Sequence, residues 1–585
     1  MSKRILALLV AAVMSTSVLA GCKKDDKKPE EPTTTETTEE TKEETKEEEK
    51  SDDEAKADTE ELDADQYINT FDSAWPITFD PATGDDSYGN AALFNISEPL
   101  IRVAEDEAGN AKYVMAGAES YDVSEDGLTY TFHIRKGMKW TDGDELNAQD
   151  YAYAVRRCAD PETACPYANM VYLVKNGEKV NNGELKVSDL GVATPDDYTL
   201  EVTLEQPCAY FIDTVTQRIY FPQREDLVEQ LGDQYGSSDI NNIPICGPYK
   251  IADMTINNEL VYEKNPDYWN ADNVKVEKVN LQILKDSNTI NNALLTGELD
   301  YAGVSDPKWQ TQLADTGEYQ RVTLVRPWTG YWLMNYNEGS NVSNNKITRA
   351  LGAVIDRDEV IQNAWDGAPV PAYAFVPPTI SIQGETFNKE GEGPALDLMN
   401  DYKDKAKELF EEGCKEMGKD PATVTIKLLG SDTSDKGRIA VEAFQQQIEK
   451  ALGCKVEATN ADWNDFINRL KANDYDIAWL AWGADFNDPS NFLETNYSKT
   501  RAYPTGWTNE KFDSLIEEAK KSTDAKVRAE ALHEAERILI YEDAALVPIN
   551  HAVSNIFRRN YIRGAINNYF ATMGFQALYT VGRDK

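Results

Sequence analysis

A single carboxylate, Asp485, follows a strongly apolar run in the segment AWLAWGADFNDPSNFL, which spans residues 478–493. Trp482 and Gly483 stand just before it, and turn-forming residues follow it. A carboxylate in such a place is most often a helix cap or a turn former. A carboxylate withdrawn from water is also costly unless a positive group pairs with it. The pattern therefore offers a second prediction, a site that receives the positive group of a ligand.

The residue sets on which hydrolases and metalloenzymes depend are missing from the sequence. His533-Glu534 lacks the second histidine of the zinc-binding H-E-x-x-H motif. The chain has no G-x-S-x-G, P-loop or G-x-G-x-x-G motif, and no C-x-x-C pair that would indicate zinc. We therefore expect a binding protein that has no enzyme activity, no metal site and no cofactor.

The amino terminus has the pattern of an export signal. Lys3 and Arg4 precede the apolar run ILALLVAAVMSTSVLA, as a basic region precedes the apolar core of a signal peptide. An uncleaved signal anchor is the alternative. The run ends in Leu-Ala-Gly-Cys22, which resembles a bacterial lipobox, so residues 1–21 are expected to be removed. The resemblance implies that Cys22 is lipidated, and stable anchoring needs two or more acyl chains.

Residues 22–65 consist almost wholly of Lys, Glu, Asp and Thr. Such a segment buries too little apolar surface to offset its chain entropy, so we predict a disordered acidic tether. The formal net charge of the whole chain is −43. That charge argues against a nucleic-acid partner and against electrostatic docking on an anionic lipid surface.

Six cysteines follow Cys22, and an even number in an exported protein permits three disulfides. Cys158 and Cys165 flank the short stretch ADPETA and are the easiest pair to close. The two further pairings that we consider are Cys208–Cys246 and Cys414–Cys454. Buried free thiols are the alternative.

Strand and helix patterns are mixed along the rest of the chain, without an internal repeat of 20–50 residues. Alternating apolar residues predict strands at 129–135, 196–207 and 454–459, and a hairpin within 246–269. Apolar residues at helical spacing predict helices at 147–160, 346–365, 404–418 and 438–453. The segment 463–482 reads as helix, turn and buried strand, and 510–549 as two helices and a closing strand. These patterns predict an α/β fold with inserted antiparallel pieces, and the length of 585 residues predicts several domains.

Several of these segments carry a resemblance to a known family. They include YTFHIRKGMKWTDGDELNAQDYAYAVRR, DPETACPYA, GPYKI, EKNPDYWN, ITRALGAVIDRDEVI and GADFNDPSNFL. They resemble the oligopeptide-binding proteins of ABC importers, solute-binding protein family 5, in their lipoprotein form. The likeness runs in order from about Phe71 to the carboxyl end.

The resemblance implies a periplasmic-binding-protein-like fold, with two lobes joined by a hinge and an extra inserted domain. It divides the chain so that lobe I comprises 66–94, 227–328 and 553–585. The inserted domain would span 95–226, and lobe II 329–552. The chain would therefore cross twice between the lobes.

The resemblance also implies that an extended peptide lies between the lobes and that its free ammonium meets Asp485. Gly483 would let the peptide backbone come close, and Trp482 would cover its first residues. The other ligand positions carried over from the family are Tyr167, Trp463 and the pair Asp85-Asp86, where Asp86 would lie in the backbone-pairing position. Main-chain bonds would supply affinity and water-filled pockets would tolerate side chains. For both tryptophans the alternative is a place in the core.

One position departs from the family. Some members carry an arginine in the strand before the aspartate motif, where it helps to hold the carboxyl end of the ligand. Trp479 occupies that position here, and it is expected to lie in the core. Arg469 is one place away from the family's other basic position. The resemblance therefore does not predict how the carboxylate of the ligand is bound.

Together these features predict a monomeric extracytoplasmic receptor, anchored to the outer face of the cell membrane through Cys22. It would capture short oligopeptides between its lobes by hinge closure and deliver them to the membrane permease of an ABC importer. The alternatives are a family member that binds a sugar, a nickel chelate or a signalling peptide, a secreted hydrolase, and a surface adhesin or chaperone without a transporter.

Overall fold

The computed structural model describes residues 61–107, 109–237 and 243–583. The description below concerns the unit Glu60–Lys585. The predicted signal peptide, Cys22 and most of the tether lie outside the described residues. Within the described part of the chain, no helix is both long enough and apolar enough to cross a membrane.

The first sheet has four strands and is built from segments that lie far apart in the sequence. Its order is β1 (Tyr67–Asp72), β10 (Lys278–Ile283), β9 (Glu259–Lys264) and β8 (Tyr249–Thr255). The first pair is parallel and the others are antiparallel. Helix α1 (Ser87–Ile96) packs with this sheet around one apolar core, which also receives Ile562 and Leu578 from near the carboxyl end.

The second sheet is antiparallel and has a core of its own. Its order is β4 (Ala118–Val123), β5 (Thr129–Ile134), β7 (Thr199–Thr203) and β6 (Val192–Asp196). Tyr130, Phe132 and Ile134 alternate along β5 and are buried, so one face of the sheet packs on α2. The helices of this region are α2 (Ala148–Ala159), α3 (Ala168–Val171), α4 (Gly177–Asn181), α5 (Phe211–Val215) and α6 (Glu225–Leu231). The hairpin of β2 (Ile101–Glu105) and β3 (Ala111–Met115) precedes it.

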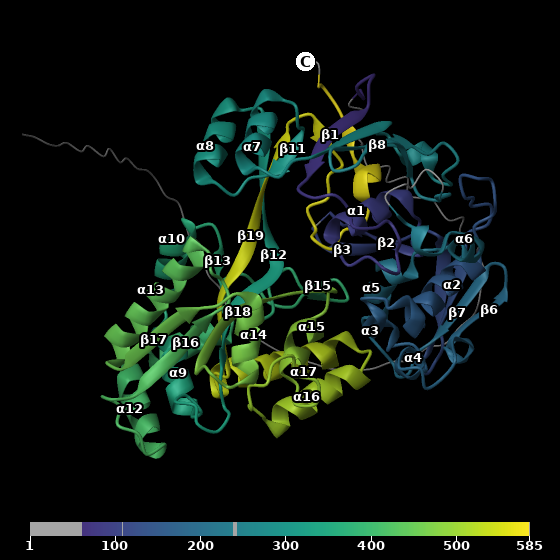
Figure 1. Cartoon of the computed structure of the whole chain (residues 1–585). Helices are drawn as coiled ribbons and strands as arrows, with labels where there is room; N and C mark the ends of the chain where they lie inside the picture. The colour runs from purple at the N-terminus through teal and green to yellow at the C-terminus, as the bar shows by residue number, and fades with distance from the viewer. Residues whose placement is uncertain (1–60, 108, 238–242, 584–585) are drawn as a thin grey trace, which may run out of the picture. The chain divides into compact units, whose positions relative to one another are not determined.

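The third sheet is mixed and contains the two longest strands among the described residues. Along its main path the order is β11 (Tyr301–Gly303), β19 (Leu546–Arg559), β12 (Tyr319–Met334), β18 (Ile477–Gly483), β16 (Thr425–Gly430) and β17 (Lys455–Asn460), and β13 (Val370–Pro371) pairs with β19. Figure 1 shows β12 and β19 running together from the region of β11 to β18. Their pairing is irregular between Val325 and Thr329. Residues 329–334 of β12 are all buried, because this half of the strand lies between β18 and β19.

Helices pack against both ends of this third sheet. Near β11 they are α7 (Ser287–Thr296) and α8 (Pro307–Thr316). Further along the chain they are α9 (Asn345–Val354), α10 (Arg357–Trp365), α11 (Pro394–Tyr402), α12 (Ala406–Glu416), α13 (Asp435–Leu452), α14 (Trp463–Lys471), α15 (Ser490–Leu493), α16 (Glu510–Lys521) and α17 (Ala525–Arg537). Two short two-stranded sheets complete the assigned strands, β14 (Ser381–Ile382) with β15 (Glu385–Thr386) and β20 (Ile562–Arg563) with β21 (Tyr579–Thr580).

Most predicted elements are present, including α2 with its Asn147 cap, but one predicted helix is wrong. The expected single helix at 346–365 is two helices, α9 and α10. Ile355 is extended, and the Asp356 side chain accepts the backbone N–H of Glu359 at 3.0 Å, so it starts a new helix. The closing strand is also longer than predicted, since β19 continues to Arg559.

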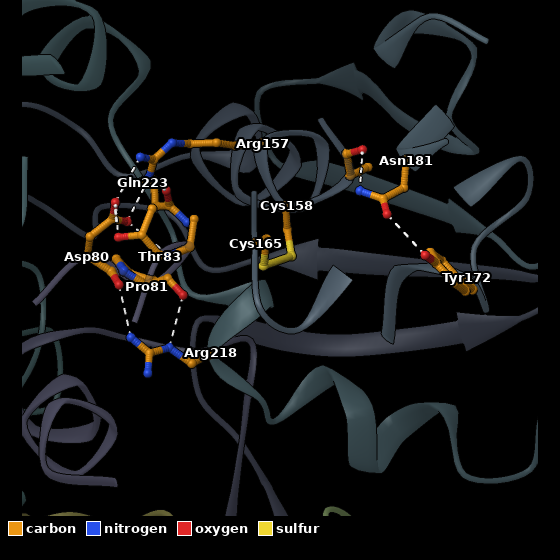
Figure 2. The surroundings of a disulfide bond; sticks show 12 residues. Asp80, Pro81, Thr83, Arg157, Cys158, Cys165, Tyr172, Asn181, Arg218 and Gln223 are labelled. Atoms are coloured by element: carbon orange, nitrogen blue, oxygen red, sulfur yellow. Dashed lines mark hydrogen bonds and ion pairs between the residues drawn. A yellow bond between two sulfur atoms is a disulfide. The ribbon is translucent and has the colours of Figure 1, made fainter. Parts of the chain in front are cut away.

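A disulfide joins Cys158 to Cys165 (Figure 2), and the other four cysteines among the described residues are free. The pairings Cys208–Cys246 and Cys414–Cys454 are therefore absent from the structure. These thiols are buried among apolar side chains, and burial raises the pKa of Cys208 to about 12 and that of Cys454 to about 11. Apolar burial keeps them protonated and unreactive, so they behave as small core residues.

Candidate functional site

Asp485 lies just past the end of β18, a central strand of the third sheet. Ile477, Ala478, Trp479 and Leu480 are buried, and exposure begins at Ala481. Asp485 itself is exposed on one side, yet the surrounding protein removes enough water to raise the pKa of its carboxyl. Among the described residues no basic side chain forms an ion pair with it.

The open edge of β18 lies next to this acid. On one side β18 pairs with β12 as far as Gly483, opposite Trp328. On the other side its pairing with β16 ends at Trp479, opposite Gly430. Within the described chain, the edge of Ala481–Gly483 that faces β16 therefore has no strand partner, and an extended peptide could pair with it.

A single side chain, Asn491, fixes both the acid and the neighbouring indole. Its Oδ1 accepts the indole N–H of Trp482 at 3.0 Å and the backbone N–H of Asp485 at 3.4 Å. A hydrogen bond from the Asn491 side chain also favours the charged form of Asp485, against the larger effect of burial on its pKa. Sequence reasoning missed Asn491, because an Asn at the start of a short helix reads only as a turn former.

Below the acid, two polar contacts hold the turn that it belongs to. The Asp488 carboxylate accepts hydrogen bonds from both terminal nitrogens of the Arg528 guanidinium, at 2.7 and 2.8 Å, and both side chains are buried. Asn487 accepts the backbone N–H of Ser381 at 2.9 Å and donates to its hydroxyl at 2.8 Å. The turn is therefore rigid before any ligand arrives.

The structure brings Tyr167, Asp85, Asp86 and Asp485 into one region. The Tyr167 hydroxyl donates to the backbone carbonyl of Asp85 at 3.4 Å. Burial raises the pKa of Tyr167, the nearby Arg218 lowers it, and the charges of Asp485, Asp85 and Asp86 raise it further. The residues predicted to lie on opposite sides of the ligand are thus close enough to influence one another.

Two arginines, Arg218 buried and Arg157 largely buried, hold the chain at Asp80 and Pro81, a few residues before Asp85 and Asp86 (Figure 2). Arg218 donates to the carbonyls of Pro81 and Asp80, both at 2.9 Å. Arg157 donates to the two carboxylate oxygens of Asp80 at 2.6 and 2.8 Å. Sequence reasoning missed Arg218, which lies more than 130 positions after the loop that it supports.

Asp86 has a structural role as well as its predicted place. Its side chain caps α1 by accepting the backbone N–H of Gly89 at 2.7 Å, and it also accepts that of Ile77 at 3.3 Å. The side chain is therefore occupied, and the carbonyls of Asp85 and Asp86 already accept the Tyr167 hydroxyl and the N–H of Asn90, so the backbone N–H groups are what this stretch could offer a ligand.

The remaining predicted positions differ in exposure. Trp482 is half-buried against an apolar core. Trp463, the first residue of α14, is 52% exposed, and its ring stacks on that of Phe466 with 5.6 Å between the ring centroids. At Gly483, a Cβ atom would come within 3.2 Å of the Trp328 ring, so the backbone there is closely packed. Trp479 is buried, as predicted.

Two cavities are relevant to these residues. One of about 490 Å³ lies at the open edge of β18 and is lined by Leu480 and Ala481. The other, of about 460 Å³, lies against the first sheet and α1, and none of the predicted site residues lines it. Among the described residues no group of three or more His, Cys, Asp or Glu side chains could hold a metal ion.

Comparison with known proteins agrees with this geometry. Residues 112–504 match the family described as bacterial extracellular solute-binding proteins, family 5 Middle. The oligopeptide-binding protein OppA of Bacillus subtilis (strain 168) is 33% identical over 501 residues, which are 84% of this chain and 88% of that protein.

Solved structures of related proteins share the fold. OppA of Listeria monocytogenes bound to peptide has a TM-score of 0.65 and 28% identity, with 88% of this chain and 99% of that chain covered. Haemophilus influenzae OppA in complex with RPPGFSPFR has a TM-score of 0.67 and 26% identity, with 89% and 100% covered. These findings confirm the α/β fold of the solute-binding proteins that the sequence motifs predicted. The chain belongs to the bacterial extracellular solute-binding proteins of family 5.

Proposed function

We propose that this protein is an extracytoplasmic receptor that binds short peptides and delivers them to an ABC importer. The observation that carries the proposal is Asp485, an accessible and partly desolvated acid without a basic partner among the described residues, beside an open strand edge. Relatives at 33% identity and solved structures with bound peptide support the same reading.

In this proposal the free ammonium of the peptide pairs with Asp485. The peptide backbone then adds to the edge of Ala481–Gly483, and Tyr167 and the Asp85 backbone lie on its other side. Because main-chain groups make most of these bonds, the site accepts different side chains. The ammonium supplies the positive charge that the partly buried acid lacks, and so it sets the direction of the peptide.

The division into lobes is part of the proposal. Lobe I would comprise 66–94, 227–328 and 553–585, the inserted domain 95–226, and lobe II 329–552. The sheet of β1, β10, β9 and β8 lies in the ranges of lobe I, and the sheet of β4, β5, β7 and β6 lies in the inserted domain. Their separate cores also fall within these two parts of the chain. The two crossings fall within β12 and β19, whose pairing is irregular between Val325 and Thr329, and bending there would close the lobes.

The role is capture and release without chemistry on the peptide, as is usual in a family of substrate-binding receptors. We propose that the receptor acts as a monomer and that a lipid on Cys22 holds it at the outer face of the cell membrane. The acidic stretch 22–65 would then act as the tether between the anchor and the binding unit.

The test removes the negative charge of Asp485 and keeps the size of the side chain. Asp485→Asn is expected to weaken binding of free-amine alanine peptides about tenfold or more in titration calorimetry, because a charge-assisted hydrogen bond is lost. The matched control is Glu457→Gln, at an exposed carboxylate on β17, which should bind as the wild type does. Equal affinity of the wild type for free and N-acetylated peptides would refute the role of Asp485.

A further inference from the structure

The cavity of about 490 Å³ beside β18 continues the open edge on which Asp485 lies. Ala481 lines it and stands four positions before that acid. Four positions of extended chain span at most about 13 Å, so a peptide that starts at Asp485 would bring roughly its third or fourth residue to the cavity. A volume of this size is within the range of ligand pockets, about 300–1,000 Å³.

Much of the wall of this cavity is aromatic. Trp328, Trp365 and Trp479 all line it. The ring centroids of Trp365 and Trp479 lie 5.9 Å apart, at an interplanar angle of 52°. The ring of Phe444 packs on that of Trp479 with 5.6 Å between their centroids. Such a wall favours a large apolar side chain over a charged or small one.

Two buried polar groups on the same wall lack partners. Trp479 is 5% exposed, and its indole N–H finds no hydrogen-bond acceptor among the described residues. Asn550 is 3% exposed, and its Oδ1 accepts no hydrogen bond from them. Neither atom is accessible to water, so both lie behind the wall of the cavity, and the surface that a ligand would meet consists of the aromatic rings and the charged side chains.

The charges on the wall favour an anion. Arg326 and Lys436 line the cavity, and neither forms an ion pair with a described residue. Among the described residues, the Arg326 side chain donates only to the Tyr569 hydroxyl, at 3.4 Å. The acid on the wall is Asp432, and one of its oxygens already accepts the backbone N–H of Ser434 at 2.8 Å. Two cations against one acid leave a net positive wall.

We propose, building on the peptide-binding function above, that this cavity selects peptides that carry a large apolar side chain and a carboxylate at this depth of the groove. The side chain packs among Trp328, Trp365 and Trp479. Arg326 and Lys436 bind the carboxylate, which is either the peptide's own carboxyl end or a neighbouring acidic side chain.

The test uses alanine peptides of increasing length, each with tryptophan at one position in turn, prepared as free acids and as amides. Titration calorimetry with the wild-type protein should find one position, counted from the free amine, where tryptophan tightens binding about tenfold. Amidation of a peptide that ends there should weaken binding about tenfold, because a charge-assisted hydrogen bond is lost. A glutamate next to that position in an amidated peptide would restore binding if an acidic side chain can supply the carboxylate.

Variants then assign the residues. Arg326→Gln and Lys436→Gln should each reduce the difference between acid and amide, whereas Lys450→Gln, at an exposed site on the other end of α13, should keep it. Trp479→Phe should weaken binding a few-fold while the acid–amide difference stays.

Two results would overturn this inference and leave the proposed function intact. One is that tryptophan tightens binding at no position, and the other is that acids and amides bind equally while Asp485→Asn still weakens binding of free-amine peptides. If no peptide binds in any form, the proposed function fails together with it.

Discussion

The buried ion pair below the ligand turn allows a quantitative test of what holds that turn. Arg528 and Asp488 are 2% and 4% exposed at the side chain, and the pair is bidentate. In Arg528→Met the chain keeps a side chain of similar length but loses the charge. Asp488 would then keep only the N–H and hydroxyl of Ser490, at 2.9 and 2.6 Å.

The expected cost of this change is large. At a charge separation of about 4 Å and an effective dielectric constant of about 20, the pair contributes about 4 kcal/mol of attraction. Removing one partner of a buried pair typically costs about 3–5 kcal/mol, because the other charge stays buried and uncompensated. We therefore expect Arg528→Met to lower the free energy of unfolding by about 4 kcal/mol.

Urea unfolding followed by tryptophan fluorescence measures this loss. The matched control is Lys526→Met on the same helix, whose contact with Glu530 is exposed and 3.9 Å long. That change should cost no more than about 1 kcal/mol. Peptide affinity should also fall in Arg528→Met, since Asp485 belongs to the same turn. If Arg528→Met is no less stable than Lys526→Met, the pair does not support the turn and the reasoning is wrong.

Two further predictions concern the stability of the folded unit. Burial raises the pKa of Glu536 to about 7, although the backbone N–H groups of Phe375 and Val376 favour its charged form. The folded pKa of Glu536 lies above the ordinary value of 4.5, so the contribution of Glu536 to stability is full below about pH 4.5 and is lost as pH rises through 7. In Glu536→Gln, the free energy of unfolding measured by urea titration should therefore depend less on pH in this range. Replacing both Cys158 and Cys165 by serine should lower the free energy of unfolding by about 2.5 kcal/mol, the value for a closed loop of about eight residues, and a reducing agent should affect the wild type only. An unchanged pH profile, or a serine variant as stable as the oxidised wild type, would contradict the respective assignment.

The sequence identified the acid of the candidate site but not the residues that support it. Asp485 stood out because an apolar strand, a glycine and a tryptophan precede it. Asn491 and Arg218 gave no such signal, since an Asn near a turn and an Arg in a short helical turn are common. Their roles depend on contacts across the fold, such as Arg218 with the carbonyls of Asp80 and Pro81, and no local pattern encodes these.

Two differences between the sequence expectations and the structure have local physical causes. The helix at 346–365 was predicted as one because its apolar spacing continues, but Asp356 makes a better cap than an interior residue. The pairing of Cys414 with Cys454 was considered because the number of cysteines is even, with buried free thiols as the alternative, and in the structure both are free thiols in one apolar core. Periodicity and counting thus identify element types but do not determine boundaries or covalent links.

The cavity beside β18 could not be predicted from the motifs, because its polar residues come from separate strands. Trp479 on β18 and Asn550 on β19 reach the same space, as does Arg326 on β12. Sequence reasoning placed Trp479 in the core, which is correct for its ring. Its unpaired N–H was visible only once the neighbouring strands were in place.

Two acids three positions apart show how the same residue type serves structure and function. Asp488 has Arg528 and Ser490 as partners and is buried, so it stabilises the fold and has no capacity left for a ligand. Asp485 has its backbone fixed by Asn491 but no cation beside it among the described residues, so its charge is available. The paired acid makes the turn rigid, and that rigidity keeps the other acid from moving to satisfy itself. An ammonium from outside therefore gains the full interaction without first reorganising the site.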